Sequence, residues 1–191
     1  MGTWKQIVVL PVTAVGVPNT NNVDGVAQLN ESLESRITRA LAAAPPEVAH
    51  GARVVDTDSD GNTIVLREGT NGVTCWPGNP NHDVDPPVCM DAPSMQGAAD
   101  FKARKPMPTN KTPGITYMLA GGTQWWSTSD PYDITKPTIR IGPHWMIMWP
   151  FNPKTTGLPA APKDAGAHIV WAGSPYAHVI CHGPAVKVAD Y

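Results

Sequence analysis

The sequence predicts an α+β fold in which an antiparallel or barrel-like sheet of short strands is flanked by one long and one short helix. The chain of 191 residues contains 21 prolines and 17 glycines, which require many turns and argue against a helical bundle. Several short apolar stretches have the two-residue period of strands, and one longer stretch has helical spacing. Charged residues make up only 16%, against about 25% in an average domain, which indicates extensive burial in the fold or in an oligomer such as a homodimer.

The N-terminal region is expected to be an arm. Residues 7–17 form an apolar run that follows Lys5, as in an export signal, but Pro11 interrupts it and no small-x-small cleavage site follows. We therefore favour a strand or arm over residues 1–23, followed by a single α+β domain over residues 24–191. A cytoplasmic location is favoured over secretion, and no segment has the roughly 20 apolar residues that a membrane span needs.

Two helices are predicted. The first covers residues 24–44, with Asp24 as the N-cap and two prolines after its end. Its apolar side chains recur three and four residues apart: Val26, Leu29, Leu33, Ile37 and Leu41. The second, shorter helix covers residues 91–104, with Asp91 as its N-cap and a proline in its first turn.

The strands are expected to be short. Residues 52–68 are predicted to form a hairpin, because two β-branched stretches flank a Ser-Asp-Gly-Asn turn. Residues 69–91 are predicted to be a long loop. Further strands are expected at 114–119, 138–141, 144–149, 167–171 and 176–181.

The hairpin turn also matches the first half of a calcium loop. Asp56, Asp58 and Asp60 alternate before Gly61, as the ligands of such a loop do. The twelfth position is Arg67, where a bidentate glutamate is required, and the residues after the turn have a strand pattern. A polar hairpin turn is therefore favoured over calcium binding.

Two of the predicted strands place histidines among large apolar side chains. In the first, alternation puts His144, Met146 and Met148 on one face and Trp145, Ile147 and Trp149 on the other. In the second, the residues that share a face are Tyr176, His178, Ile180 and His182. Such strands are typical of a lined binding site, and equally of a core that contains a few hydrogen-bonded histidines.

The leading hypothesis is a small-molecule enzyme without a nucleotide cofactor, because the chain has no P-loop and no G-x-G-x-x-G motif. His144 and His178 would transfer protons, and Asp91 would orient one of them, as in an isomerase, cyclase or lyase of a hydrophobic substrate. Aromatic and thioether side chains would line the substrate pocket. The residues predicted to bind the substrate are Trp125, Trp126, Trp145, Trp149, Tyr176 and Met146.

The alternative is a non-catalytic binding protein, either for a small apolar ligand or for a transition metal such as copper or zinc. A metal would be held by His144, His178 and His182, since imidazole suits these ions and nearby thioethers favour Cu(I). No cofactor is predicted for the leading hypothesis, and a transition metal belongs only to this alternative. Nucleic acid is not an expected partner, because the net charge is −2 and no basic run is found.

The chain has three cysteines. Cys75 and Cys89 bracket part of the predicted loop, and their spacing fits no compact zinc motif. A disulfide between them, or two unlinked thiols, is favoured over zinc, and Cys181 would then be a free thiol.

Six segments carry a further pattern: Leu66–Cys75, Asp85–Asp91, Gly114–Leu119, Ser127–Pro131, Pro143–Ile147 and Trp171–His178. Together they resemble a family of small uncharacterised proteins, many of them bacterial and carrying export signals, over roughly residues 37–180. The resemblance implies that Cys75, Cys89, Asp91, His144 and His178 occupy motif positions. It implies no activity. Because His182 lies outside the pattern, the resemblance weakens the three-histidine metal hypothesis, and it carries no export signal over to residues 1–36.

Overall fold

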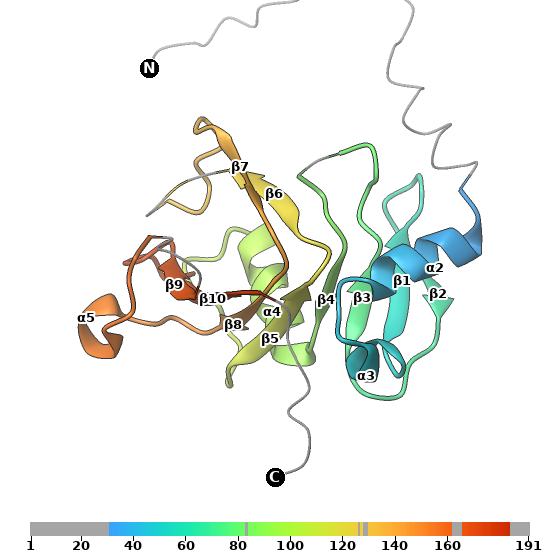
Figure 1. Cartoon of the computed structure of the whole chain (residues 1–191), viewed down its shortest axis with the longest axis horizontal. Coiled ribbons are helices and arrows are strands. Elements are labelled where there is room, and N and C mark those ends of the chain that lie inside the picture. The colour runs from blue at the N-terminus through green and yellow to red at the C-terminus, as the bar shows by residue number, and fades with distance from the viewer. Residues whose placement is uncertain (1–30, 83, 126, 128–129, 162–165, 184–191) are drawn as a thin grey trace, which may run out of the picture.

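The computed structural model describes residues 31–82, 84–125, 127, 130–161 and 166–183, so the expected arm over residues 1–23 lies outside it. Ten strands are found in this part of the chain: β1 (Arg53–Thr57), β2 (Thr63–Arg67), β3 (Thr74–Trp76), β4 (Val88–Met90), β5 (Gly114–Met118), β6 (Gly122–Trp125), β7 (Thr138–Ile141), β8 (His144–Met148), β9 (Ala167–Val170) and β10 (His178–His182). Eight of them form one sheet in the order β2-β1-β3-β4-β5-β8-β10-β9, and β6 pairs with β7 in a second sheet (Figure 1).

The large sheet is mainly antiparallel, as predicted, and is open. The exception is the pair β1 and β3, which is parallel because the chain returns past β1 after the β1–β2 hairpin. The barrel-like alternative is wrong, since β2 and β9 are the two edges of the sheet. Strands from residues 53–90 make one half and strands from residues 114–182 the other, and the halves meet where Cys89 and Met90 of β4 pair with β5.

Four helices accompany the sheets in the described residues: α2 (Leu33–Leu41), α3 (Pro46–Ala49), α4 (Ala92–Lys102) and α5 (Pro153–Thr156). The predicted long helix over 24–44 is not confirmed: α2 begins after Ser32, whose hydroxyl accepts a hydrogen bond from the Ser35 backbone N–H at 3.1 Å. The expected cap Asp24 lies outside the described residues. The second helix is confirmed as α4, with Asp91 as its N-cap. None of these helices is long and apolar enough to cross a membrane.

Strand register divides the side chains of the large sheet between two faces, because directly paired residues point the same way. The first, here called the disulfide face, carries Cys75, Cys89, Tyr117, Trp145 and Cys181. The second, here called the histidine face, carries Thr116, Met118, His144, Met146, His168, His178, Ile180 and His182. Helices α2 and α3 cover the disulfide face, whereas α4 and β7 pack on the histidine face.

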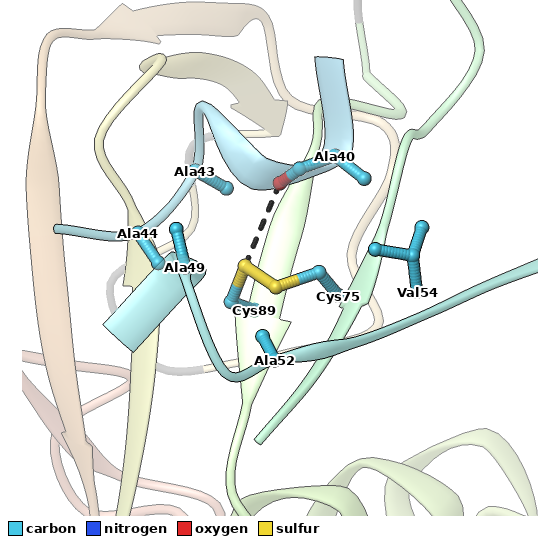
Figure 2. Close-up of a cluster of buried hydrophobic side chains, with 8 residues drawn as sticks. All are labelled: Ala40, Ala43, Ala44, Ala49, Ala52, Val54, Cys75 and Cys89. Atoms are coloured by element: carbon cyan, nitrogen blue, oxygen red, sulfur yellow. Dashed lines mark hydrogen bonds between the residues drawn. A yellow bond between two sulfur atoms is a disulfide. The ribbon is translucent and has the colours of Figure 1, made fainter. Parts of the chain in front are cut away.

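The core under α2 and α3 is built from small side chains (Figure 2). Its buried members are Ala40, Ala43, Ala44, Ala49, Ala52, Val54, Cys75 and Cys89. Alanine lets the helix backbone approach the sheet closely, so that the Cys89 Sγ lies 3.5 Å from the Ala40 carbonyl oxygen. Cys75 and Cys89 are directly paired on β3 and β4 and are joined in a disulfide. The prediction of a continuous loop over 69–91 is therefore wrong, because it contains these two three-residue strands.

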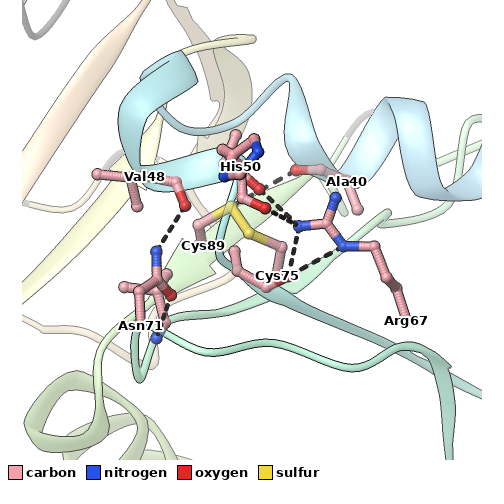
Figure 3. The surroundings of a disulfide bond; sticks show 10 residues. Ala40, Val48, His50, Arg67, Asn71, Cys75 and Cys89 are labelled. Carbon is pink, nitrogen blue, oxygen red and sulfur yellow. Dashed lines mark hydrogen bonds between the residues drawn. A yellow bond between two sulfur atoms is a disulfide. The ribbon is translucent and has the colours of Figure 1, made fainter.

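Side chains from the β2 region fasten the turn between α3 and β1 beside the disulfide (Figure 3). The Arg67 guanidinium donates to the carbonyl oxygens of Ala49, His50 and Ala52, at 2.5–3.2 Å. Asn71 Nδ2 donates to the Val48 carbonyl oxygen at 2.7 Å. Arg67, the residue that departs from the calcium-loop pattern, thus serves to connect the hairpin to α3.

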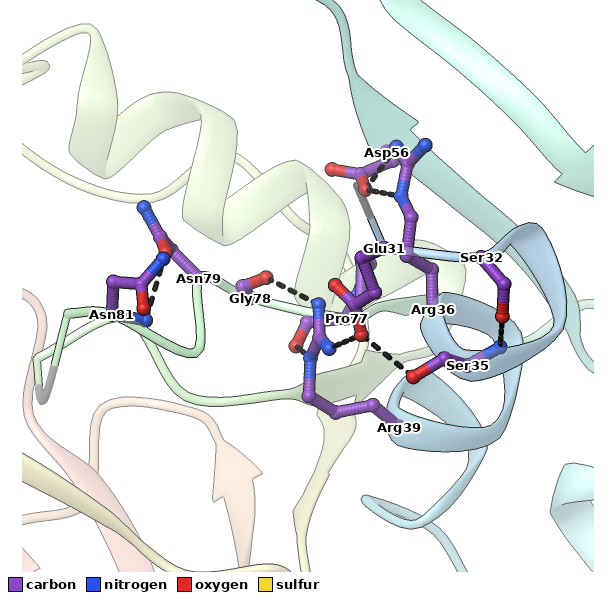
Figure 4. A network of polar contacts seen from close by, with 10 residues as sticks. All are labelled: Glu31, Ser32, Ser35, Arg36, Arg39, Asp56, Pro77, Gly78, Asn79 and Asn81. Carbon is purple, nitrogen blue, oxygen red and sulfur yellow. Dashed lines mark hydrogen bonds and ion pairs between the residues drawn. The ribbon is translucent and has the colours of Figure 1, made fainter. Parts of the chain in front are cut away.

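Two of the three aspartates of the calcium-like pattern, Asp56 and Asp58, have structural partners for their side chains. Asp56 pairs with Arg36 of α2 in a polar network that also joins Arg39 to Glu31 (Figure 4). Asp58 Oδ1 accepts hydrogen bonds from the backbone N–H groups of Asp60 and Asn62, at 2.9 and 2.8 Å. The favoured prediction of a polar hairpin turn is confirmed.

Candidate functional site

A pocket of about 200 Å³ lies on the histidine face, between α4 and the strands β5 and β8. Its walls are mainly apolar and include Phe101, Met118, Met146, Met148, Trp149 and Trp171. Four polar side chains reach it: Asn110, Gln124, Tyr176 and His178. Among the residues that the structure describes, no charged side chain lines this pocket.

Four of the predicted site residues, Met146, Trp149, Tyr176 and His178, do line the pocket. Trp145 does not belong to it, because it alternates with Met146 along β8 and therefore points to the disulfide face. Trp126 and the side chain of Trp125 lie outside the described part of the chain. Alternation correctly places Trp145 opposite His144, whereas Trp149, predicted to share the face of Trp145, lines the pocket.

His178 is the buried polar group of the pocket, with 4% of its surface exposed. Its Nδ1 lies 3.0 Å from the Tyr176 carbonyl oxygen. A carbonyl can only accept, so Nδ1 carries the hydrogen and Nε2 is the acceptor nitrogen. Burial lowers the pKa of His178 to about 4, the hydrogen bond to Tyr176 opposing it in part, so the imidazole is uncharged at neutral pH.

His144 lies on the same face but away from the pocket. It is 2% exposed, its Nδ1 donates to the Gly142 carbonyl oxygen at 2.8 Å, and burial lowers its pKa. Val179 pairs with Ile147, so the preceding residue, His178, lies at the level of Met148 on β8. Met148 is four residues from His144, which places the backbones of His178 and His144 roughly 13 Å apart along the strand direction. The two imidazoles share a face because His144 pairs with His182, and His144 also lowers the pKa of His178, but His144 does not line the pocket.

A second pair of histidines lies farther along the histidine face. The Nε2 of His182 lies 3.1 Å from the Nδ1 of His168, and the two rings stack with centroids 5.1 Å apart. Burial, with smaller effects from His182 and His178, lowers the pKa of His168 to about 4. His168 was not among the site residues predicted from the sequence, although an imidazole within an apolar strand is a weak sign of a site. The contact between His168 and His182 follows only from the register of β9 and β10.

The predicted metal site is not supported by this arrangement. His182, one of the three expected ligands, is hydrogen-bonded to His168. The described residues contain no group of three or more histidine, cysteine, aspartate or glutamate side chains placed to hold a metal ion. Binding of copper or zinc by His144, His178 and His182 stays a prediction.

Asp91 has backbone partners in place of the imidazole that we expected. Its Oδ1 accepts from the Ser94 N–H at 2.9 Å and caps α4, while its Oδ2 accepts from the Ile115 N–H of β5 at 2.8 Å. The carboxylate thereby fastens the start of α4 to the sheet, which fixes one wall of the pocket. Backbone carbonyls, from Gly142 and Tyr176, orient the two histidines instead.

An aromatic stack continues the pocket wall outward. The ring of Phe101 stacks on Tyr132 and on Trp171, with centroids 4.6 and 5.5 Å apart, and the Arg104 guanidinium lies 4.5 Å from the Tyr132 centroid. Tyr176 meets Phe101 edge to face at 5.3 Å. Offset and edge-to-face pairs of this kind add stability beyond the area that they bury, so the wall is held in one arrangement.

Two members of this stack have an unusual backbone. Arg104 and Trp171, each with a φ of 52°, are the non-glycine residues with positive φ in the described ranges. Such a conformation costs about 1–3 kcal/mol, and it occurs preferentially at ligand clamps and active sites. At Arg104 the left-handed conformation ends α4, since Arg104 is the residue that follows the helix C-cap Ala103.

The segment after α4 is fixed by Asp100, which is 1% exposed. The carboxylate accepts from the Thr109 N–H at 2.6 Å and pairs with Lys105 Nζ at 2.6 Å, and these contacts hold its pKa well below the usual range. The Tyr176 hydroxyl donates to the Lys105 carbonyl oxygen at 2.9 Å. Asp100 thus positions the segment that leads to Asn110 in the pocket.

No family model, curated protein or solved structure matches this chain. The resemblance to a family of small exported proteins therefore stays a prediction. The chemistry of the pocket itself is the basis for the function proposed below.

Proposed function

We propose that this protein binds a small, predominantly apolar molecule in the pocket between α4 and the histidine face. The observation that carries this proposal is an apolar, aromatic pocket with one buried, uncharged imidazole, His178, in its wall. Small-molecule sites typically have this composition, in which apolar walls supply affinity and a few fixed polar groups supply orientation.

The size of the pocket supports a ligand of one ring. A cavity of about 150 Å³ is enough to bind benzene in another protein. The pocket here has about 200 Å³ and therefore fits an aromatic ring with a short substituent. The capped start of α4, the Asp100 contacts and the aromatic stack support a site that is formed before the ligand arrives, which lowers the entropy cost of binding.

Binding is favoured over the acid/base catalysis that the sequence predicts. A general base works best when its pKa lies near the operating pH. The low pKa of His178 makes it a hydrogen-bond acceptor more than a proton acceptor at neutral pH. Its expected partners, His144 and Asp91, are engaged with backbone groups elsewhere. An isomerase, cyclase or lyase activity stays a prediction without geometric support.

The Cys75–Cys89 disulfide bears on where such binding would take place. Disulfides persist in oxidising compartments and are rare in the cytosol. They therefore favour export over the cytoplasmic location that we expected from the sequence. An oxidising compartment outside the cytoplasm is accordingly part of the proposed function.

Binding of toluene, measured by isothermal titration calorimetry, tests the pocket directly. Ala98 of α4 lines it, whereas the next residue, Ala99, is exposed. The Ala98→Phe substitution should fill the pocket and weaken toluene binding at least tenfold, and the matched Ala99→Phe substitution should leave binding unchanged. Absence of saturable toluene binding to the wild-type protein, or equal binding by the two variants, would refute the proposal.

A further inference from the structure

The polar side chains of the pocket share a property that bears on the ligand: their donors are already used. Tyr176 donates its hydroxyl hydrogen to the Lys105 carbonyl oxygen, and His178 donates from Nδ1 to the Tyr176 carbonyl oxygen. The amide nitrogen of Asn110 donates to the carbonyl oxygens of Thr112 and Met148, at 2.9 and 3.3 Å. Because every one of these partners is a carbonyl, the donor assignment follows from chemistry.

What these three side chains can still offer a ligand is lone pairs. The groups left over are the Nε2 of His178 and the amide oxygen of Asn110, whereas the phenolic oxygen of Tyr176 also interacts with the Tyr132 side chain. The remaining polar residue, Gln124 on β6, can present either end of its amide and so adapts to a ligand that the others select.

We propose that the ligand is a neutral aromatic molecule that carries a hydrogen-bond donor on its ring, of the phenol or aryl amine class, with the donor directed at the Nε2 of His178. This inference rests on the proposed function and specifies its ligand. A molecule that brings only acceptors would leave the Nε2 of His178 without a partner, and an unpaired buried polar group opposes binding.

The lack of charge around the pocket argues for a neutral ligand. An ammonium group could also donate to these acceptors, but a buried charge requires a counter-charge. No carboxylate lines the pocket in the described part of the chain, and Asp100 is committed to Lys105 and Thr109. An aryl carboxylate would find no cation and no free donor among the three fixed side chains.

The walls argue for a flat ring. Met118, Met146 and Met148 bring thioethers to the pocket, and sulfur makes favourable contacts with aromatic ring edges. Phe101 and Trp171, whose rings stack on each other, also line the pocket. A planar ring can pack among these thioether and aromatic side chains while its hydroxyl or amino group reaches His178.

Three probes of similar size separate the donor from the ring: phenol, which has a donor, anisole, which has oxygen without a donor, and toluene, which has neither. For each protein, the ratio of the phenol affinity to the toluene affinity is measured. This ratio should be about tenfold larger for the wild-type protein than for the His178→Phe variant, which is the typical effect of one net hydrogen bond. Anisole should show no such dependence on the variant.

A spectroscopic measurement on the wild-type protein makes the test independent of how the variant folds. The ¹⁵N chemical shift of the His178 Nε2 should move toward the hydrogen-bonded value on addition of phenol, and should not move with toluene. Equal affinities for all three probes, an unmoved Nε2 signal, or tighter binding of benzylammonium than of phenol would overturn the donor proposal. If toluene also failed to bind, the proposed function itself would fail, so the two failures are distinguishable.

Discussion

Replacement of His178 by asparagine is expected to make the stability of the protein less dependent on pH. In the unfolded chain this histidine takes up a proton below its ordinary pKa of 6.5, whereas in the folded protein it does so only below about 4. Between these values the unfolded state binds more protons, so acidification favours unfolding. The stabilising effect of the neutral ring is complete above pH 6.5 and is lost as the pH falls toward 4.

The size of the effect follows from the two pKa values. A difference of one pH unit corresponds to about 1.4 kcal/mol, so the interval from 6.5 to about 4 amounts to about 3 kcal/mol in total. At pH 5 the loss should be about 2 kcal/mol relative to pH 7.5. Asparagine does not titrate, and its amide can replace Nδ1 as the donor to the Tyr176 carbonyl oxygen.

Urea unfolding at pH 7.5 and pH 5, followed by tryptophan fluorescence, measures this difference. The wild-type protein should lose about 2 kcal/mol more than the His178→Asn variant on acidification. His168→Asn should act in the same direction, because burial lowers the pKa of His168 to about 4 as well. Parallel losses in the wild-type protein and both variants would show that the imidazoles are not held neutral, and the reasoning would be refuted.

Three further substitutions test how the site is supported. Removal of the Cys75–Cys89 disulfide, which closes a loop with a sequence separation of 14, should lower the free energy of unfolding by about 3 kcal/mol in urea titrations, and an unchanged midpoint would contradict this. Asp91→Ala should cost about 2 kcal/mol by thermal unfolding, because it removes an N-cap and a strand contact, and should also weaken toluene binding, because Asp91 fixes the α4 wall of the pocket; an unchanged unfolding temperature would contradict this. Gly114→Ala should also cost about 2 kcal/mol, because a Cβ there would overlap the backbone nitrogen of the α4 first turn, whereas Gly142→Ala, with open space around it, should stay within about 0.5 kcal/mol.

Elements with a strong local signal could be predicted from the sequence. Asp91 and the proline after it identify the start of α4, and the Ser-Asp-Gly-Asn turn identifies the β1–β2 hairpin. The strands β3 and β4 could not be predicted, because three residues are too few to display alternation. The start of α2 was not predicted, because Asp24 was the expected N-cap whereas Ser32, eight residues later, caps the helix.

The site was only partly readable, since it depends on which strands become neighbours. Alternation alone predicts that His178 and Met146 each lie on an apolar face, and both reach the pocket. The separation of His144 from the pocket and the meeting of His168 with His182 follow from register, which is a property of paired strands. The amide nitrogen of Asn110 donates to the carbonyl oxygen of Met148, which is distant in sequence. The sequence alone therefore does not show that this donor is already engaged.

The division of the large sheet into two sequence-contiguous halves gives the molecule a modular character. The cross-linked half, residues 53–90, and the pocket half, residues 114–182, share a seam in which only Cys89 and Met90 pair with β5. Each half makes its strand pairings from one continuous stretch of chain, so each can form as a cooperative unit during folding.

The halves also touch beyond these pairs, because Tyr117 of β5 packs against the disulfide core and the Leu119 N–H donates to the Ala43 carbonyl oxygen at 2.9 Å. The chain itself runs from β4 directly into α4, which lines the pocket. A change in the oxidation state of the cysteines can therefore be transmitted to the ligand site through β5 and through α4.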